Sequence, residues 1–130
     1  MDLSKAAQDE LVVRAQAVRL NAYCPYSGFA VGAALLAESG RIYEGANCEC
    51  ASFGGTICAE RAALTGAVSA GERSFTAIAV AADGSVSPCG ICRQLLTEFG
   101  DMIVLSASAQ GEAKKITTLS ALLPDAFVKF

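Results

Sequence analysis

Three cysteines and one glutamate are the residues whose types and spacing could support catalysis. Cys58 and Glu60 stand two residues apart in the segment "TICAERAAL", and Cys89 and Cys92 form a Cys-x-x-Cys pair in "SPCGICRQLL". In a reducing compartment, clustered cysteines more often bind a metal or take part in catalysis than form disulfides. Because the chain contains no histidine, thiolates and carboxylates must supply the ligands of any transition-metal site.

These side chains suit an open zinc site. Zinc bound by three protein ligands keeps one position for water, whereas a structural site usually closes with four. We therefore expect Cys58, Cys89 and Cys92 to bind zinc. Glu60 follows the first ligand by two residues, so its carboxylate can lie over the open position and carry protons.

A structural zinc site is the alternative reading of the same segment. Cys48 or Cys50 would then supply a fourth thiolate. Glu60 would be an ordinary acid in the first turn of a helix, where it complements the helix dipole. Spacing alone leaves this alternative open.

The negative charge of a zinc site built on three thiolates needs an offset. Cys58 and Cys89 are predicted to start helices, whose N-terminal dipoles and free N–H groups favour negative charge. Arg61 and Arg93 each follow a ligand or its acid partner directly. Both are candidates to donate hydrogen bonds to the sulfurs and so to neutralise charge, and surface ion pairs are the alternative.

The elements that must position these residues follow from hydrophobic periodicity and turn signals. Helices are predicted over residues 4–21, with Ser4 as the N-cap, over residues 57–70, and from about residue 89. Strands are predicted over residues 29–37, 41–46, 75–82, 102–108 and 115–117, and a helical turn over residues 119–124. Strands that alternate with helices in this way predict an α/β fold, a three-layer α/β/α sandwich with a mixed five-stranded sheet. Residues 1–130 are expected to form a single domain.

Small residues dominate the second predicted helix. They are Ala59, Ala62, Ala63, Gly66, Ala67 and Ala70. Small side chains let a neighbouring backbone come close, so this helix is either buried centrally in the subunit or crosses its counterpart in another subunit.

Composition limits the classes of partner. Apolar residues make up 53% of the chain, which favours burial of some apolar surface between subunits. The net charge is -3 and the basic residues form no run, so binding to long nucleic acid is disfavoured. The amphipathic N-terminal segment contains acids and resembles neither a signal peptide nor a membrane span. We expect a cytoplasmic protein that does not bind membranes.

Five segments carry a resemblance to a known family: "CPYSGFAVGAALL", "GRIYEGAN", "ICAERAAL", "VSPCGICRQLL" and "LLPDAF". In order and spacing they are similar to the small, single-domain, three-cysteine cytidine deaminases, which form homotetramers. The resemblance implies that Cys58, Cys89 and Cys92 bind Zn²⁺ and that Glu60 is the proton shuttle. It also implies a cytidine deaminase-like fold and a place in pyrimidine salvage.

The resemblance extends to residues that would bind a nucleoside. Asn47 and Glu49 match an asparagine and a glutamate that hold the ribose 3'-hydroxyl. Phe29 matches an aromatic residue beside the pyrimidine. The backbone of Ala59 and of Cys89 would read the polar edge of the base.

One further match concerns contact between subunits, and two positions differ from the family pattern. Phe127 matches a C-terminal aromatic residue that reaches the site of a neighbouring subunit. The family usually has an asparagine at Cys50 and a tyrosine at Phe53, and both differences bear on sugar recognition.

The expected reaction is zinc-dependent hydrolytic deamination. Cytidine and deoxycytidine would be converted to uridine and deoxyuridine with release of ammonia. The alternative is a deaminase of another aminopyrimidine nucleoside such as blasticidin S. A non-catalytic zinc module and an editor of bases within RNA or DNA are disfavoured, the latter because the chain is acidic and has no basic stripe.

Overall fold

The sheet of the molecule contains five strands of mixed direction. The structure is a computed structural model that describes residues 2–84 and 86–128. The strands are β1 (Val31–Ala37), β2 (Ile42–Ala46), β3 (Phe75–Ala82), β4 (Ile103–Ala107) and β5 (Ala113–Thr118). Their order in the sheet is β2-β1-β3-β4-β5. The pair β3 and β4 is parallel, and the other three pairs are antiparallel.

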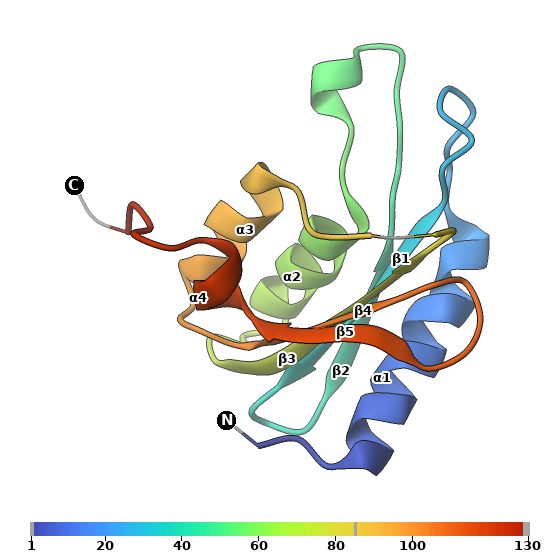
Figure 1. Cartoon of the computed structure of the whole chain (residues 1–130). Helices are drawn as coiled ribbons and strands as arrows, with labels where there is room; N and C mark the ends of the chain where they lie inside the picture. Colours follow the sequence, from blue (N-terminus) through green and yellow to red (C-terminus); the bar gives the residue numbers. More distant parts are fainter. Residues whose placement is uncertain (1, 85, 129–130) are drawn as a thin grey trace.

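Helices cover both faces of this sheet (Figure 1). On one face lies α1 (Lys5–Val18); on the other lie α2 (Ala59–Ser69), α3 (Gly90–Thr97) and the short α4 (Leu119–Leu122). Single 3-10 turns occupy Arg19–Asn21 and Phe53–Gly55. The predicted three-layer α/β/α architecture with a mixed five-stranded sheet is therefore confirmed.

The two cores follow from alternation along the strands. Leu35 of β1 and Val104 of β4 belong to the buried cluster on the face covered by α2, α3 and α4, whereas Ala34 and Leu105, their neighbours in sequence, belong to the cluster under α1. Successive side chains of a strand point to opposite faces of a sheet. Apolar residues at every position of a central strand therefore require a helix on each side.

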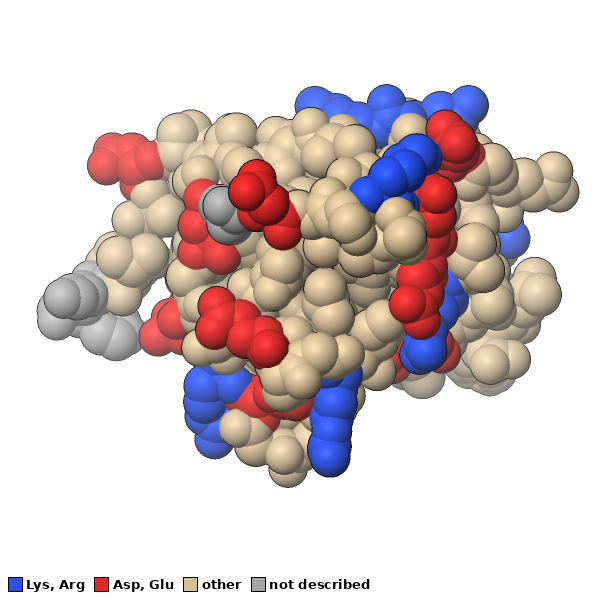
Figure 2. Space-filling model, turned by 90° about the horizontal axis from the view of Figure 1, so that it is seen from below, with Lys and Arg blue, Asp and Glu red and all other residues tan. Residues whose placement is uncertain are grey.

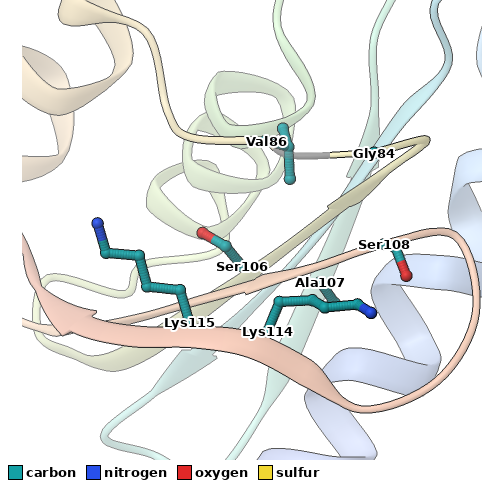
Figure 3. Close-up of a pocket in the computed structure, with 7 residues that line it drawn as sticks. All are labelled: Gly84, Val86, Ser106, Ala107, Ser108, Lys114 and Lys115. Atoms are coloured by element: carbon teal, nitrogen blue, oxygen red, sulfur yellow. The ribbon is translucent and has the colours of Figure 1, made fainter.

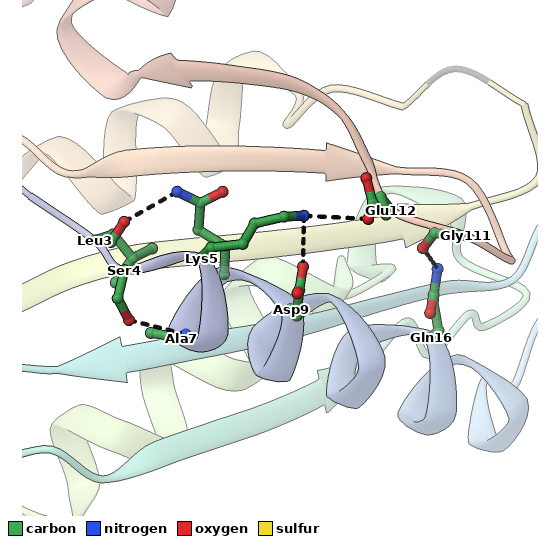
Figure 4. A network of polar contacts seen from close by, with 9 residues as sticks. Leu3, Ser4, Lys5, Ala7, Asp9, Gln16, Gly111 and Glu112 are labelled. Atoms are coloured by element: carbon green, nitrogen blue, oxygen red, sulfur yellow. Dashed lines mark hydrogen bonds and ion pairs between the residues drawn. The ribbon is translucent and has the colours of Figure 1, made fainter.

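Polar contacts fix α1 against the β4–β5 loop (Figure 4). The Ser4 hydroxyl accepts a hydrogen bond from a backbone N–H of the first turn, which confirms the predicted N-cap. Lys5 forms an ion pair with Glu112 at 3.3 Å, and Gln16 donates to the carbonyl oxygen of Gly111 at 2.9 Å. These contacts join the N-terminal helix to the far edge of the sheet.

Two strand glycines allow helices to lie unusually close to the sheet. A Cβ atom at Gly32 would lie 2.0 Å from the carbonyl oxygen of Ala15 in α1. A Cβ atom at Gly45 would lie 2.6 Å from the carbonyl oxygen of Ala59 and 2.5 Å from the amide nitrogen of Ala63, both in α2. Each glycine thus sets the distance of one helix from the sheet.

The small residues of α2 serve this close approach on one side of the helix. Ala59, Ala63 and Ala67 are buried against the sheet, as expected for a helix that packs centrally within the subunit. Gly66 and Ala70 are exposed. Burial within the subunit therefore explains the small residues on the buried side of α2. Contact with a second subunit stays a prediction for the exposed side.

Element boundaries differ from the sequence predictions by a few residues. The first helix becomes a 3-10 turn at Arg19, and β1 begins at Val31, two residues later than predicted. The 3-10 turn at Phe53–Gly55 was predicted as loop. All of the predicted helices and strands are present.

Charges are mixed on the face shown in Figure 2, where Lys and Arg side chains lie among Asp and Glu side chains. Within residues 2–84 and 86–128, no helix has both the length and the apolar character needed to cross a bilayer.

Candidate active site

The sulfur atoms of three cysteines converge where α2 and α3 begin. Cys58 is the N-cap of α2 and Cys89 the N-cap of α3, and Cys92 lies in the first turn of α3. The Sγ atoms of Cys58 and Cys89 are 3.9 Å apart, those of Cys89 and Cys92 are 3.6 Å apart, and all three lie within 4.8 Å of one another.

This spacing fits a zinc ion. Ligands at about 2.3 Å in tetrahedral geometry place neighbouring sulfur atoms about 3.8 Å apart, close to both measured separations. Burial, followed by repulsion from Glu60 and Cys58, raises the pKa of the Cys92 thiol. A bound cation would offset that effect and stabilise the thiolate.

Cys48 and Cys50 lie outside this group in the part of the chain that the structure describes. The backbone of Cys48 exchanges two hydrogen bonds with Ile57, each of 2.9 Å, and its side chain is exposed. The Cys50 thiol donates to the carbonyl oxygen of Ser52. The described residues therefore offer three thiolates, and the geometry favours an open site over a closed structural one.

Glu60 is a buried carboxylate beside the metal group. Glu60 lies in the first turn of α2, whose N-terminus faces the cavity, and only 4% of the residue is exposed. Burial raises the pKa of its carboxyl group above the usual value. A raised pKa makes a carboxyl group a stronger proton acceptor, which favours its use in acid–base catalysis.

Arg61 lies where a charge-neutralising residue would be needed. Its Nη2 atom donates to Cys58 Sγ at 3.7 Å and to the carbonyl oxygen of Thr56 at 2.9 Å. The hydrogen bond to Cys58 is the main cause of the raised pKa of Arg61. The Nε atom of Arg61 is buried without a hydrogen-bond partner among the described residues.

Arg93 has another role than the one expected. Instead of a sulfur atom, its guanidinium contacts the carbonyl oxygen of Pro88, the hydroxyl of Ser87 and the carbonyl oxygen of Leu122. Arg93 therefore forms neither the candidate hydrogen bond to a thiolate nor, among the described residues, the alternative surface ion pair, because these oxygens occupy the guanidinium. Arg93 instead ties the loop before α3 to α4.

A cavity of about 260 Å³ opens beside the metal group. Its lining includes most of the side chains predicted from sequence: Phe29, Asn47, Glu49, Cys58, Ala59, Glu60 and Cys89. Backbone pairing explains how the sugar-binding candidates reach it. Residues 47–49 run between Tyr23 and Ile57, so Asn47 and Glu49 lie on one side of this segment and Cys48 on the other.

Sequence reasoning missed several residues of the cavity. They are Ser27, Val31, Thr56, Val86 and Ser87. The sequence contained a signal for Ser27. In Ser-Gly-Phe, a serine hydroxyl stands two residues before Phe29, and at this spacing serine side chains often hydrogen-bond to the backbone. The others line the cavity through tertiary packing, for which local sequence has no signal.

Phe127 lies outside this cavity of its own chain. Its residue is 61% exposed, and its carbonyl oxygen accepts a hydrogen bond from Gln94 of α3. Its expected place in the site of a neighbouring subunit concerns a second copy of the chain.

A second cavity, of about 320 Å³, lies at the ends of β4 and β5 and shares Val86 with the first (Figure 3). Lys114 and Lys115 line it, but their side chains extend in opposite directions (Figure 3). The two ammonium groups therefore do not converge on one ligand.

The site defines a class of enzyme. A three-thiolate metal group beside a buried carboxylate, at the start of two helices of an α/β/α fold, is the arrangement of a zinc-dependent hydrolytic enzyme.

Comparison with known proteins identifies the family. Residues 5–107 match the family described as "Cytidine and deoxycytidylate deaminase zinc-binding region". The cytidine deaminase of Sporosarcina psychrophila is 50% identical over 125 residues, which cover 93% of this chain and 91% of that protein. The cytidine deaminase of Halalkalibacterium halodurans is 50% identical over 121 residues, covering 90% and 91%.

A solved structure agrees with these relatives. The crystal structure of cytidine deaminase from Burkholderia pseudomallei matches with a TM-score of 0.84 and 41% identity, and the match covers 96% of this chain and 100% of that chain. The chain therefore belongs to the cytidine and deoxycytidylate deaminase family. The predicted zinc cofactor and the predicted family are confirmed.

Proposed function

We propose that the chain catalyses hydrolytic deamination of cytidine and deoxycytidine, with uridine or deoxyuridine and ammonia as products. The observation that carries this proposal is the three-sulfur group with a buried glutamate at the wall of one cavity. Relatives 50% identical to this chain are named cytidine deaminases, which supports the same substrates.

Cys58, Cys89 and Cys92 would hold the zinc ion in this reaction. A bound zinc ion supplies Lewis acidity that lets water act as a nucleophile at neutral pH. Arg61 stabilises the thiolates by donating to Cys58. The N-termini of α2 and α3, which begin after Cys58 and Cys89, add favourable dipoles.

Glu60 would move the protons. Its carboxylate takes a proton from the attacking water and passes it to N3 of the pyrimidine. It then takes the proton of the hydroxyl newly added at C4 and gives it to the amine, which leaves as ammonia while the C4 carbonyl forms. The raised pKa of Glu60 supports this role, because the carboxyl group must be stable in both protonation states.

The remaining cavity residues would orient the nucleoside. The Glu49 carboxylate would accept a hydrogen bond from the ribose 3'-hydroxyl. Asn47 would meet the same hydroxyl, and Phe29 would lie beside the ring. The backbone of Ala59 and of Cys89 would meet the polar edge of the base. All five residues line the cavity, which supports these assignments.

A deaminase specific for blasticidin S is not favoured, because the similar proteins over most of the chain are named cytidine deaminases. Phe53 and Cys50 lie near the sugar-binding candidates in sequence, so they bear on which nucleoside the site accepts.

We further propose a homotetramer in which Phe127 enters the site of a neighbouring subunit. Large apolar side chains are exposed on the single chain, among them Leu20 at 80% and Phe53 at 69%, and an assembly would bury them. Light scattering coupled to size exclusion would measure the mass. A monomer at working concentration would contradict this proposal.

A cytoplasmic location and a part in pyrimidine salvage complete the proposal. The three thiols must stay reduced to bind zinc, as they do in a reducing compartment. Residues 1–130 would act as one catalytic domain, supported by the single sheet to which the described helices pack.

Ultraviolet absorbance tests the reaction directly. Purified protein is mixed with cytidine, and loss of the cytidine band is followed while zinc per chain is measured on the same sample. Loss of the band with about one zinc per chain would support the proposal. Full zinc content without turnover of cytidine or deoxycytidine, but with turnover of blasticidin S, would overturn it.

A further inference from the structure

We propose that Ser27 is a positioning residue that fixes both the carboxylate of Glu49 and the backbone of Phe29, and so sets the affinity for the sugar of the substrate. This inference rests on the proposed function, in which Glu49 meets the ribose and Phe29 the ring. It concerns a residue outside the metal group and outside the predicted substrate contacts.

The turn that carries Ser27 has a defined shape. Gly28 donates its N–H to the carbonyl oxygen of Cys24 at 2.9 Å and closes the turn. Gly28 has a φ of 68°, a left-handed conformation that glycine adopts without strain. The turn therefore presents successive N–H groups on one side.

Glu49 receives three hydrogen bonds from this turn. Its Oε1 atom accepts from the N–H groups of Tyr26 and Ser27, each at 3.1 Å, and its Oε2 atom accepts from the Ser27 hydroxyl at 2.5 Å. These donors lower the pKa of Glu49, with the Ser27 hydroxyl as the main cause. No Lys or Arg among the described residues forms an ion pair with Glu49.

The direction of the Ser27 hydroxyl is determined by its neighbours. Its oxygen accepts a hydrogen bond from the N–H of Phe29 at 3.0 Å. A hydroxyl group has a single hydrogen to donate, and an N–H can only donate. The hydrogen of Ser27 is therefore directed to Glu49, and one side chain joins the two substrate-facing residues.

Phe29 is held from its other side by Asn47. The Nδ2 atom of Asn47 donates to the carbonyl oxygen of Phe29 at 2.9 Å, and its Oδ1 atom accepts from Val31 N–H at 2.8 Å. Ser27 and Asn47 thus hold the two ends of the same residue. Removal of the Ser27 hydroxyl would free one end of Phe29 and one oxygen of Glu49 together.

The test is steady-state kinetics of Ser27→Ala with cytidine and with 3'-deoxycytidine. With cytidine, KM is expected to rise about tenfold with little change in kcat, as loss of one hydrogen bond to a charged group implies. With 3'-deoxycytidine the rise should be smaller, because this substrate lacks the hydroxyl that Glu49 meets and only the effect through Phe29 remains. Ser27→Thr, which keeps a hydroxyl, should restore most of the affinity. Ser27→Cys, with a weaker donor, should fall between them and replaces Ser27→Ala if that variant does not fold.

Ser39 provides a matched control. Its hydroxyl donates to Glu72 at 2.7 Å and accepts from Arg41 N–H two residues later at 3.3 Å, the same pattern as at Ser27. It lies outside the residues that line the cavity. Ser39→Ala should therefore leave both KM values unchanged.

The outcomes separate the inference from the proposed function. An unchanged KM for cytidine in Ser27→Ala, or an equal rise for both substrates, would overturn the role of Ser27 while wild-type turnover of cytidine stands. Absence of cytidine turnover by the zinc-loaded wild type would overturn the proposed function, and the inference with it.

Discussion

The sulfur atoms of Cys58 and Cys89 lie 3.9 Å apart, although 31 positions separate the two residues in the chain. Each is the N-cap of a helix, and the two helices follow different strands. The metal group therefore joins two connections of the fold at the N-termini of their helices. Loss of one ligand should consequently affect stability as well as metal binding.

Cys89→Ala is expected to reduce zinc from about one per chain to nearly none, because a site with two remaining thiolates holds the metal poorly. The melting temperature should fall as well. Atomic emission on dialysed protein and thermal unfolding would measure both. Cys50→Ala is the matched control, since the Cys50 thiol is exposed and donates to Ser52. Full zinc content in Cys89→Ala would refute the assignment of the ligand.

Glu60→Gln is expected to keep zinc and to lose turnover by about 10²- to 10⁴-fold, because the amide cannot carry the proton. Zinc analysis and cytidine absorbance would be measured on the same sample. Glu38→Gln changes an exposed glutamate after β1 in the same way and should keep full activity. Near-normal turnover by Glu60→Gln would show that another group moves the proton.

Gly45→Ala should lower both stability and kcat. The added methyl group would collide with backbone atoms of Ala59 and Ala63, so α2 and its Glu60 must move outward. Overpacking of this kind costs about 1 to 3 kcal/mol. Urea unfolding and kcat per bound zinc would measure the two effects.

Gly32→Ala is the control for that prediction. It overpacks α1 on the opposite face of the sheet, which carries none of the proposed catalytic residues. It should destabilise the protein while the folded fraction keeps its kcat. An equal loss of kcat in both variants would mean that activity follows general stability rather than the position of α2.

Glu72 should contribute a pH-dependent term to the free energy of unfolding. The hydroxyl groups of Ser39 and Tyr43 donate to its carboxylate at 2.7 and 2.8 Å, and with Ser39 as the main cause they lower its pKa. Because the pKa of Glu72 is lower in the folded than in the unfolded state, its carboxylate stabilises the folded protein. The contribution is fully present above the unfolded-state pKa of about 4.3 and is lost as pH falls through the folded-state pKa.

Glu72→Gln is accordingly expected to flatten the acid side of the stability profile. Urea midpoints between about pH 6 and pH 3 would be compared for variant and wild type. The difference in urea midpoint between wild type and variant should shrink as pH falls. Release of zinc at low pH would affect both proteins alike. A constant difference over this range would contradict the role of the carboxylate.

Much of the site could be predicted from sequence because its chemistry is local. Cys58 and Glu60 stand in one segment, Cys89 and Cys92 in another, and each segment begins a helix after an extended stretch. The apolar run of β3 was likewise bounded by clear turn signals. The order of the helices and strands then sufficed for the three layers.

The parts that were missed depend on tertiary contacts. Arg93 and Arg61 occupy similar places in sequence, yet one contacts a sulfur atom and the other contacts backbone and hydroxyl oxygens. Which oxygens are near depends on the approach of α4, far along the chain. Ser27 became a central donor only because residues 47–49 pair beside its turn.

The position of the three thiols also has a consequence for the order of events in refolding. Cys58 lies in the connection from β2 to β3, and Cys89 and Cys92 lie in the crossover between the parallel strands β3 and β4. Contacts between residues far apart in sequence form late, since long loops must close first. Tight zinc uptake therefore requires that the N-termini of α2 and α3 have come together, and the rate at which a refolding sample sequesters the metal reports how fast this long-range contact forms.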